Sequence, residues 1–329
     1  MDETTLKQVL SRAAGRSVGV LGDFCVDAYW ELHPEAGERS IETGIVTTPV
    51  GSARYAPGGA GNIAANLRAL GVERIPCFGA LGADPFGDWL RRALFPDGAE
   101  AEGDHLLRVE NREYHTPVYC KPLLRGVEQS RFDLGNVPLG NADSGELLHR
   151  LEGALATLDV LVVNQQLSRG IHSEFFRREF SALLKRAPRL PRIVFDGRDH
   201  LDAYTGVILK INASAASVLA FGRPDAPPEK SGNAIMGKTG GALVVTDGEN
   251  GCFVFERGET THIPAIRCDG PVDTVGAGDS FTAGVALALA GGSPLTEAAE
   301  LGNACAALTI RKLAQTGVPS PEELAALFG

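Results

Sequence analysis

The chain has 329 residues, of which 44% are hydrophobic and 22% are charged, and its formal net charge at pH 7 is −10. This length and composition are typical of an ordinary globular protein with a sizeable core, arranged as one large domain or two small ones. The acidic balance argues against nucleic acid and anionic membrane as primary partners, because neither would meet a basic surface.

The N-terminal segment MDETTLKQVLSRAAGRS has an amphipathic, acidic-then-basic helical pattern without the apolar core of an export signal. No apolar run reaches the length that spans a bilayer. The six cysteines contain no C-x-x-C pair and no zinc spacing with histidine. We therefore expect a reduced, cytoplasmic protein without a membrane partner.

Apolar runs and helical patterns follow each other along the rest of the chain. Strands are expected at 17–23, 74–82, 158–164, 192–198, 241–248 and 251–257. Helices are expected at 59–71, 85–95, 171–187, 277–292 and 296–314. This succession predicts an α/β fold with a mostly parallel sheet that is covered on both faces.

Two stretches break the alternation. Residues 38–56 and 113–132 are rich in Thr, Val, Tyr and Ile with a loose period of two, which is typical of antiparallel strands outside the main sheet. We expect them to form a small lid or interface, with bounds of about 36–56 and 112–133. Without a repeat or a low-complexity linker, residues 1–329 are interpreted as a single domain with this insertion.

Residues 232–239, GNAIMGKT, match the G-x-x-x-x-G-K-T pattern of a phosphate-binding loop. That loop needs a buried strand before it and a helix that starts at the lysine. Here a polar, proline-broken segment precedes the pattern, and a short apolar run follows it. Because the order is reversed, we interpret the match as the end of a helix that leads into a strand.

The segment DTVGAGDSFTAGVALALA, residues 273–290, carries the strongest chemical pattern. Gly276, Ala277 and Gly278 form a turn of small residues, and the helix after it leaves the N–H groups of its first turn free for an anion. Asp279 in that turn can accept a proton from a hydroxyl group. An anion site beside a base is what phosphoryl transfer to an alcohol requires. The alternative is a helix whose acidic first turn is merely favoured by its dipole.

Two separated segments resemble one family. DTVGAGDSF (273–281) resembles the C-terminal signature of the ribokinase/PfkB carbohydrate kinases, and PGGAGNIAANLRALG (57–71) is similar to their N-terminal signature. Residues 22–30 resemble the family's first strand and sugar-binding turn, residues 244–255 its nucleotide segment, and residues 301–324 its last adenine-side helix. The resemblance implies a doubly wound, ribokinase-like sheet with a β lid, and an ATP-dependent, magnesium-using kinase that acts on a hydroxyl of a sugar or sugar phosphate.

The resemblance also implies residue roles. Asp279 would be the catalytic base, within an anion hole formed with Gly276, Ala277 and Gly278. The sugar side would be formed by Asp27, Gly58, Gly59 and Asn62. The nucleotide side would be formed by Asn212, Thr246, Gly248, Gly251 and Asn303. Asp273 matches a position that holds a monovalent cation such as potassium in some members. On the residues alone, Asp27 is equally a cap or turn residue after a strand, and TDGENG (246–251) is a plain hairpin turn.

The chain departs from the family at one position. Members usually carry N-x-x-E after a strand, where the glutamate helps to order the magnesium-bound phosphates. In KINASAASVLAFG (210–222) the asparagine is Asn212, but Ala215 takes the place of the glutamate. The candidate replacements are Asp196, Asp199 and Asp202, so the magnesium ligands stay open. A rival interpretation is a catalytically lapsed protein of the same fold that binds a sugar or nucleotide.

Within the family, residues 22–30, 57–71 and 315–324 look closest to the heptose-7-phosphate kinase branch, the kinase half of ADP-heptose synthesis proteins. Against that branch stand Gln166, where it commonly carries an aspartate, and the absence of a nucleotidyltransferase half before Gly329. We also expect the lid strands to pair between subunits in a homodimer, because exposed strand edges invite pairing.

Overall fold

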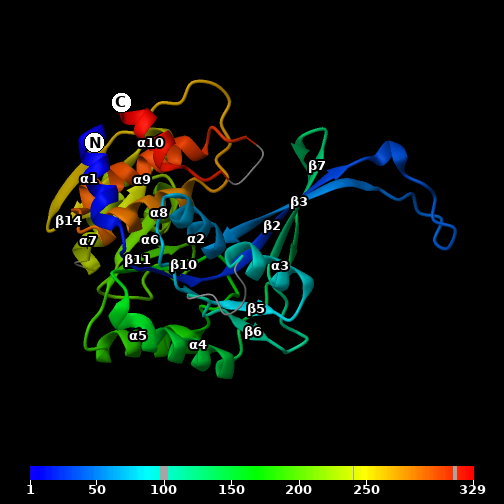
Figure 1. The fold of residues 1–329 in the computed structure, drawn as a ribbon, viewed down its shortest axis with the longest axis horizontal. Helices are drawn as coiled ribbons and strands as arrows, with labels where there is room; N and C mark the ends of the chain where they lie inside the picture. Colours follow the sequence, from blue (N-terminus) through cyan, green and yellow to red (C-terminus); the bar gives the residue numbers. More distant parts are fainter. Residues whose placement is uncertain (97–102, 240, 314–316) are drawn as a thin grey trace.

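The computed structural model describes residues 1–96, 103–239, 241–313 and 317–329. An eight-stranded sheet runs through the body, and a second sheet projects from one end of it (Figure 1). In spatial order the main sheet contains β15 (Glu259–Ile263), β14 (Cys252–Glu256), β13 (Leu243–Thr246), β12 (Ile208–Asn212), β11 (Arg192–Gly197), β10 (Val160–Gln165), β1 (Val18–Gly22) and β4 (Cys77–Phe78).

The main sheet is parallel from β4 to β13, and β14 and β15 extend it with antiparallel pairing. Strand order reverses between β1 and β10: the chain adds β4 on one side of β1, and β11, β12 and β13 on the far side of β10. In open α/β sheets, ligands bind beyond the carboxyl ends of the strands at such a reversal. The topology therefore directs attention to the ends of β10 to β13.

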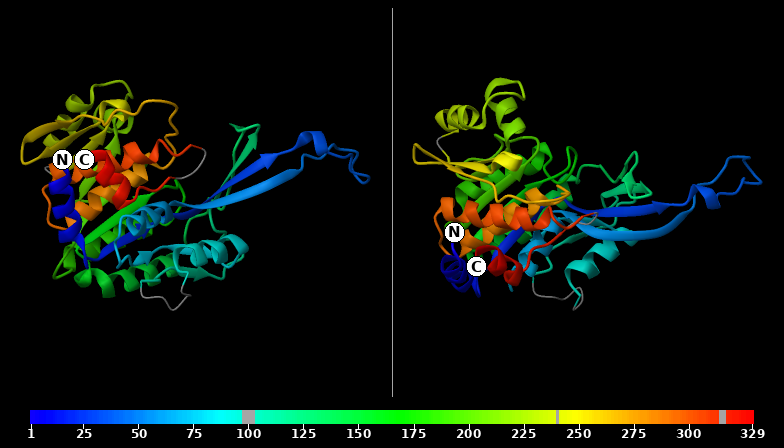
Figure 2. Two further views of the ribbon diagram at one scale, coloured as in Figure 1. Left: turned by 45° about the horizontal axis from the view of Figure 1, so that its top comes forward. Right: turned by 90° about the horizontal axis from the view of Figure 1, so that it is seen from above.

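Helices cover both faces of the sheet (Figure 2). One core cluster includes side chains of α1 (Glu3–Ala13), α2 (Ala60–Ala69), α3 (Pro85–Leu94), α8 (Ala277–Ala290), α9 (Leu295–Thr309) and α10 (Pro321–Phe328). The other includes side chains of α4 (Asn141–Ala154), α5 (Glu174–Arg186), α6 (Ala213–Phe221) and α7 (Pro228–Thr239). In β10, Val160 and Val162 join the first cluster while Leu161 and Val163 join the second, so each buried strand supplies both cores.

The lid is a five-stranded sheet. It consists of β3 (Val50–Gly59), β2 (Phe24–Leu32), β7 (Val118–Leu124), β8 (Val127–Glu128) and β9 (Phe132–Leu134). β2 pairs antiparallel with β3 and parallel with β7. Together β2 and β3 form an arm that extends well away from the body (Figure 1). A separate two-stranded sheet joins β5 (Ala80–Gly82) to β6 (Leu107–Val109).

The lid strands differ from the expected segments. Regular pairing in the first segment starts only at Val50, and residues 37–49 contain a single isolated bridge between Arg39 and Val46. Residues 22–30 were expected to end a strand and form a turn, but β2 covers residues 24–32 as a lid strand, so Asp27 lies within it. The reason is long-range pairing, because β2 is bonded along its length by β3 on one side and by β7 on the other.

The G-x-x-x-x-G-K-T segment lies within α7, and β13 follows it, as the reversed order predicted. Gly232 is required there by packing, because a Cβ atom would lie 2.1 Å from the Phe255 ring. The side chains of residues 238 and 239 lie outside the described residues. A search of the described helices for one long and apolar enough to cross a membrane finds none.

Candidate active site

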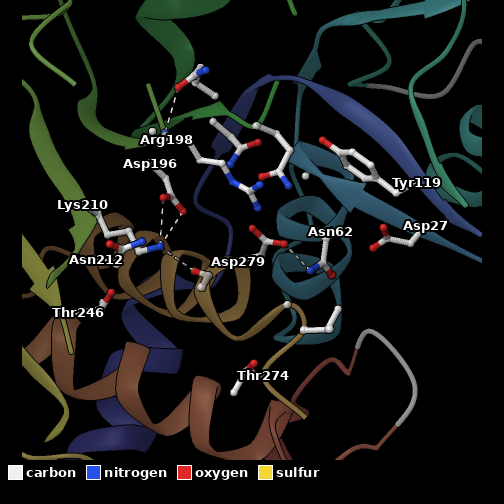
Figure 3. A pocket seen from close by; sticks show the side chains of 18 of the residues that line it. Asp27, Asn62, Tyr119, Asp196, Arg198, Lys210, Asn212, Thr246, Thr274 and Asp279 are labelled. Carbon is white, nitrogen blue, oxygen red and sulfur yellow. Dashed lines mark hydrogen bonds and ion pairs between the residues drawn. The ribbon is translucent and has the colours of Figure 1, made fainter. Parts of the chain in front are cut away.

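A cavity of about 690 Å³ opens at the carboxyl ends of β10 to β13, with lid residues forming part of its wall. Figure 3 shows Asp27 and Tyr119 at one end, Asn212 and Thr246 at the other, and Asp279 between them. The lid end and the sheet end are thus two compartments that share Asp279. This volume is in the range of small-molecule sites.

The turn before α8 forms the floor of the cavity. Gly276 caps the helix in the left-handed region, with φ of +78°, a conformation that glycine adopts without strain. The N–H of Ala277 donates to the Thr274 carbonyl at 3.2 Å, and Ala277 is absent from the described lining. Among the described residues, the N–H groups of Gly278 and Asp279 have no protein acceptor, so two donors at a helix N-terminus border the cavity.

Asp279 is held in a defined orientation. Its Oδ2 accepts a hydrogen bond from Asn62 Nδ2 at 2.7 Å, and Asn62 Oδ1 accepts one from Asn66 Nδ2 at 2.9 Å. Because Asn66 fixes the oxygen side of the Asn62 amide, the amide nitrogen must face Asp279. Asn62 and Asn66 are both buried on α2. The second carboxylate oxygen is left for a group in the cavity.

The electrostatic environment makes Asp279 more basic than an ordinary aspartate. Burial raises its pKa from 3.8 to about 6, and the charge of Asp196 contributes in the same direction. The hydrogen bond from Asn62 and the charges of Lys210 and Arg198 lower the pKa by smaller amounts. A carboxylate with a pKa near 6 is largely ionised at neutral pH and is well suited to accept a proton.

At the lid end, Asp27 is paired with a lysine that sequence reasoning missed. Lys121 Nζ lies 3.1 Å from Asp27 Oδ1 and 3.3 Å from the Tyr29 hydroxyl. Burial acts to lower the pKa of Lys121, but Asp27 and Tyr29 outweigh it and leave the pKa raised. The side chain of Lys121, which lines the cavity, is therefore cationic.

The two glycines of the N-terminal signature differ in position. Gly59 lines the cavity with φ of +55°, and a Cβ atom there would lie 2.5 Å from the Asp23 carbonyl. Gly58 is not among the lining residues, and a Cβ atom there would lie 2.8 Å from Cys25 Sγ. Close packing thus requires glycine at both positions, and Gly59 also borders the ligand space.

Two arginines join Lys121 in the cavity wall. Arg131 stacks 4.5 Å above the Tyr119 ring and pairs with Asp133 at 2.6 Å. Arg198 follows β11, and no ion pair of its guanidinium occurs in the described part of the chain. Its charge acts on both Asp279 and Tyr119. Lys121 and Arg131 are paired with Asp27 and Asp133, so Arg198 is the cation of this wall best suited to an anionic ligand, although the whole chain is acidic.

At the sheet end, Asn212 and Thr246 line the cavity. Asn212 also caps α6, because its side chain accepts the N–H of Ala215 at 2.8 Å. The segment TDGENG joins antiparallel β13 to β14, the hairpin that the residues alone indicated. The remaining residues expected on the nucleotide side or at a cation do not line the cavity: Gly248, Gly251, Asn303 and Asp273. Asn303 instead donates to the Ile263 and Pro264 carbonyls at 3.3 Å each.

The cavity offers little to a divalent cation. The described residues contain no group of three or more His, Cys, Asp or Glu side chains that could hold a metal ion. Of the three candidate replacements for the family glutamate, only Asp196 lines the cavity, and Lys210 already neutralises it at 3.0 Å. The described side chains therefore do not fit a magnesium site of their own, and the N–H groups of the α8 turn are donors available to an anion.

Comparison with known sequences gives two kinds of match. The pattern of the pfkB family carbohydrate kinases matches residues 198–322. The bifunctional protein HldE of Trichlorobacter lovleyi is 27% identical over 99% of this chain and 66% of its own length. The corresponding protein of Methylococcus capsulatus is 31% identical over 93% of this chain and 62% of its own length. The chain thus spans slightly less than two thirds of these relatives.

Solved structures are similar over nearly the whole chain. The ribokinase of Arabidopsis thaliana, solved with ribose and ATP, has a TM-score of 0.72 at 23% identity, covering 95% of this chain and 98% of that one. Phosphofructokinase-2 of Escherichia coli, solved with potassium, has a TM-score of 0.73 at 18% identity, with the same coverage. These likenesses confirm the expected doubly wound, ribokinase-like fold.

Proposed function

We propose that the chain is a member of the pfkB family of carbohydrate kinases, as its two signatures predicted, and that it transfers the γ-phosphoryl group of ATP to a hydroxyl of a phosphorylated sugar. The observation that carries this proposal is the position of Asp279 beside the unpaired N–H groups at the start of α8, in one cavity. A base and an anion site in contact are the minimum for phosphoryl transfer to an alcohol.

In the proposed reaction, Asp279 accepts the proton of the acceptor hydroxyl through the carboxylate oxygen that Asn62 leaves free. The hydroxyl oxygen forms a bond to the γ-phosphorus, and the bond from that phosphorus to the bridging oxygen of ADP breaks. The N–H groups of Gly278 and Asp279 stabilise the charge on the transferring group. Thr246 and Asn212 border the opposite end of the cavity, which would take the rest of the nucleotide.

The acceptor is proposed to carry a phosphate because three cations, Lys121, Arg131 and Arg198, line the cavity that contains Asp279. Asp27 and Asp133 pair with Lys121 and Arg131, whereas Arg198 has no ion pair in the described part of the chain. A cation that borders a ligand space without a carboxylate partner favours an anionic ligand over a neutral sugar. Together with the resemblance to the heptose-7-phosphate kinase branch, this makes a heptose 7-phosphate the first acceptor to test.

The test is ADP release over a panel that includes ribose, fructose 6-phosphate, a heptose 7-phosphate and its unphosphorylated counterpart. We expect saturable turnover with at least one phosphorylated member, and the phosphorylated product by ³¹P NMR. Ala215 favours the rival, a lapsed binding protein of the same fold. Binding of ATP or sugar without turnover on any member would support that rival.

The pH dependence of turnover follows from the raised pKa of Asp279. Because the base must be ionised, kcat/KM should fall as pH drops below about 6 and level off above it. The measurement is a pH profile of kcat/KM from 5 to 8.5 with the best acceptor of the panel. An acidic limb that is absent down to pH 5 would show that Asp279 does not titrate in this range.

We also propose that the lid forms the interface of a homodimer. Ile41, Ile45 and Val46 are exposed on the arm, and Phe132 and Leu134 are exposed on the edge strand β9. Apolar side chains beside an unpaired strand edge are typical of an interaction surface. Sedimentation equilibrium should show a dimer at micromolar concentration, and Phe132→Asp should weaken it. A wild-type monomer under the same conditions would contradict the proposal.

Two further assignments are proposals of the same kind. The six cysteines are all free, which fits a reducing compartment such as the cytoplasm. A monovalent cation near Asp273 stays a prediction. The carboxylate of Asp273 accepts the N–H of Val275 at 3.0 Å, and Asp273 is not among the residues that line the cavity. Potassium titration of turnover would test it.

A further inference from the structure

Lys210 and Asp196 form a buried ion pair in the wall of the cavity that takes no part in the steps above. Lys210 Nζ lies 3.1 and 3.0 Å from the two carboxylate oxygens of Asp196. Lys210 is only 8% exposed, and its neighbours along β12 are apolar. A lysine in such a strand is costly, and replacing a buried ion pair with well-packed apolar residues is often neutral or stabilising. Stability is therefore a weak explanation for this pair.

The pair is joined to the start of α8 by two further contacts. Thr282 Oγ1 donates to Asp196 Oδ2 at 2.6 Å and lies 2.9 Å from the Gly278 carbonyl, and Lys210 Nζ lies 3.4 Å from the same carbonyl. These groups form a closed ring, which we call the Lys210 clamp: Lys210, Asp196, Thr282 and the Gly278 carbonyl. The clamp ties β11 and β12 to the turn whose N–H groups border the cavity (Figure 3).

Asp279 is the next residue after Gly278, and two members of the clamp, Asp196 and Lys210, are charged groups that act on its carboxylate. The charged groups that act on Asp279 come from three places: Asp196 on β11, Arg198 after β11 and Lys210 on β12. The charge of Asp279 in turn acts on the thiol of Cys25 on β2. Asn62 on α2 adds the hydrogen bond. Asp196 and Lys210 act on Asp279 with opposite signs, so each cancels part of the other's effect.

We propose that the Lys210 clamp is a positioning device for the base: it holds the first turn of α8 against the sheet and balances the charge of Asp196 beside Asp279. Lys210 and Asp196 are proposed as positioning residues, since the Lys210 ammonium group contacts both carboxylate oxygens of Asp196 and the Gly278 carbonyl. The contribution of the clamp to catalysis rests on the proposed function. The effect of the clamp on the titration of the Asp279 carboxyl can be measured without turnover.

The test is an NMR titration of ¹³Cγ-labelled aspartate side chains, with the Asp279 signal assigned by its loss in Asp279→Asn. Lys210→Met leaves the Asp196 charge unbalanced, so the Asp279 midpoint should move up by about one pH unit. Asp196→Asn leaves the lysine charge unbalanced, so the midpoint should move down by about one unit. The double variant Asp196→Asn/Lys210→Met should fall between the two single variants.

Controls keep the result interpretable. Lys210→Arg keeps the charge, so its Asp279 midpoint should stay within a few tenths of a pH unit of the wild-type value. Glu152→Gln removes one partner of an exposed ion pair on α4 and should leave the midpoint unchanged. The double variant carries no unpaired buried charge, so it remains informative if Lys210→Met fails to fold.

The acidic limb of kcat/KM should follow the NMR midpoint across these variants. Equal midpoints in the wild type, both single variants and the double variant would overturn the clamp, even if the wild type turns over. Shifted midpoints in the expected order would support the clamp, even if no acceptor in the panel is phosphorylated. The two proposals therefore fail separately.

Discussion

The Asp279→Asn variant should lose about a thousandfold in kcat, because a positioned general base typically contributes 10² to 10⁴ to a rate. An asparagine keeps the shape of the side chain and can still accept the hydrogen bond from Asn62, but it cannot take a proton. Binding of ATP and of the acceptor should change little. Single-turnover kinetics measure the rate of phosphoryl transfer, and calorimetry measures the affinities for ATP and the acceptor. A loss of rate below tenfold would mean that another group is the base.

Thermal stability provides the control for this variant. The pKa of Asp279 is raised in the folded state from 3.8 to about 6, so ionising the carboxyl costs folding free energy, and the full cost is present above pH 6. The neutral asparagine avoids that cost. The melting temperature of Asp279→Asn should therefore exceed that of wild type at pH 8, and the difference should shrink towards pH 5. A variant that is both inactive and less stable at pH 8 would point to damage rather than to loss of a base.

The Lys121→Met variant should raise KM for a phosphorylated acceptor by about 10- to 100-fold, since a hydrogen bond to a charged group contributes about 1.5–3 kcal/mol. Removing the ammonium group also leaves Asp27 unpaired, and its negative charge would then repel the phosphate. The effect on kcat should be smaller, because Lys121 lies at the lid end of the cavity and makes no contact with Asp279 in the described contacts. Initial-rate kinetics with both substrates varied would measure it.

Comparison of acceptors separates the charge effect from a general disturbance of the lid. The same variant should bind an unphosphorylated acceptor almost as well as wild type does. Lys7→Met on α1 removes an exposed lysine paired with Glu3 and serves as the matched control. A similar loss for phosphorylated and unphosphorylated acceptors would argue against a phosphate at Lys121.

Much of the fold could be predicted because its signals are local. Buried parallel strands such as 158–164 are continuous apolar runs, and α2 ends where Gly71 follows with φ of +89°. The turn at Gly276 and the acidic first turn of α8 lie within four residues, so a short motif contains both the proposed anion site and the proposed base. The structure brings Asn62 to Asp279 across 217 positions of the sequence, a contact that the sequence did not predict, although the resemblance implied a place for Asn62 in the sugar pocket.

The lid end of the site could not be predicted in the same way. Lys121 reaches Asp27 because β7 pairs in parallel with β2, and the register places Lys121 opposite Tyr29. Parallel pairing between strands that are far apart in sequence leaves no local trace, since hairpin turn signals mark only antiparallel neighbours. For the same reason residues 22–30 were interpreted as a strand followed by a turn, whereas the structure continues them as β2.

The sequence around Lys210 itself indicates a buried charge. In the segment GVILKIN, residues 206–212, Lys210 is the one charged side chain in a run otherwise suited to a buried strand. A charge at such a position needs a buried partner, and the structure supplies it in Asp196. Asp196 was instead considered as a magnesium ligand, a role that its ion pair with Lys210 does not favour.

The central claim is that Asp279 takes the proton of an acceptor hydroxyl beside an anion site at the start of α8. A crystal structure with a non-hydrolysable ATP analogue and the best acceptor tests it most directly. We predict that a hydroxyl oxygen lies about 2.6–3.2 Å from the Asp279 carboxylate, with γ-phosphate oxygens on the N–H groups of Gly278 and Asp279. An acceptor bound with every hydroxyl beyond the reach of Asp279, or a γ-phosphate held elsewhere, would contradict the account.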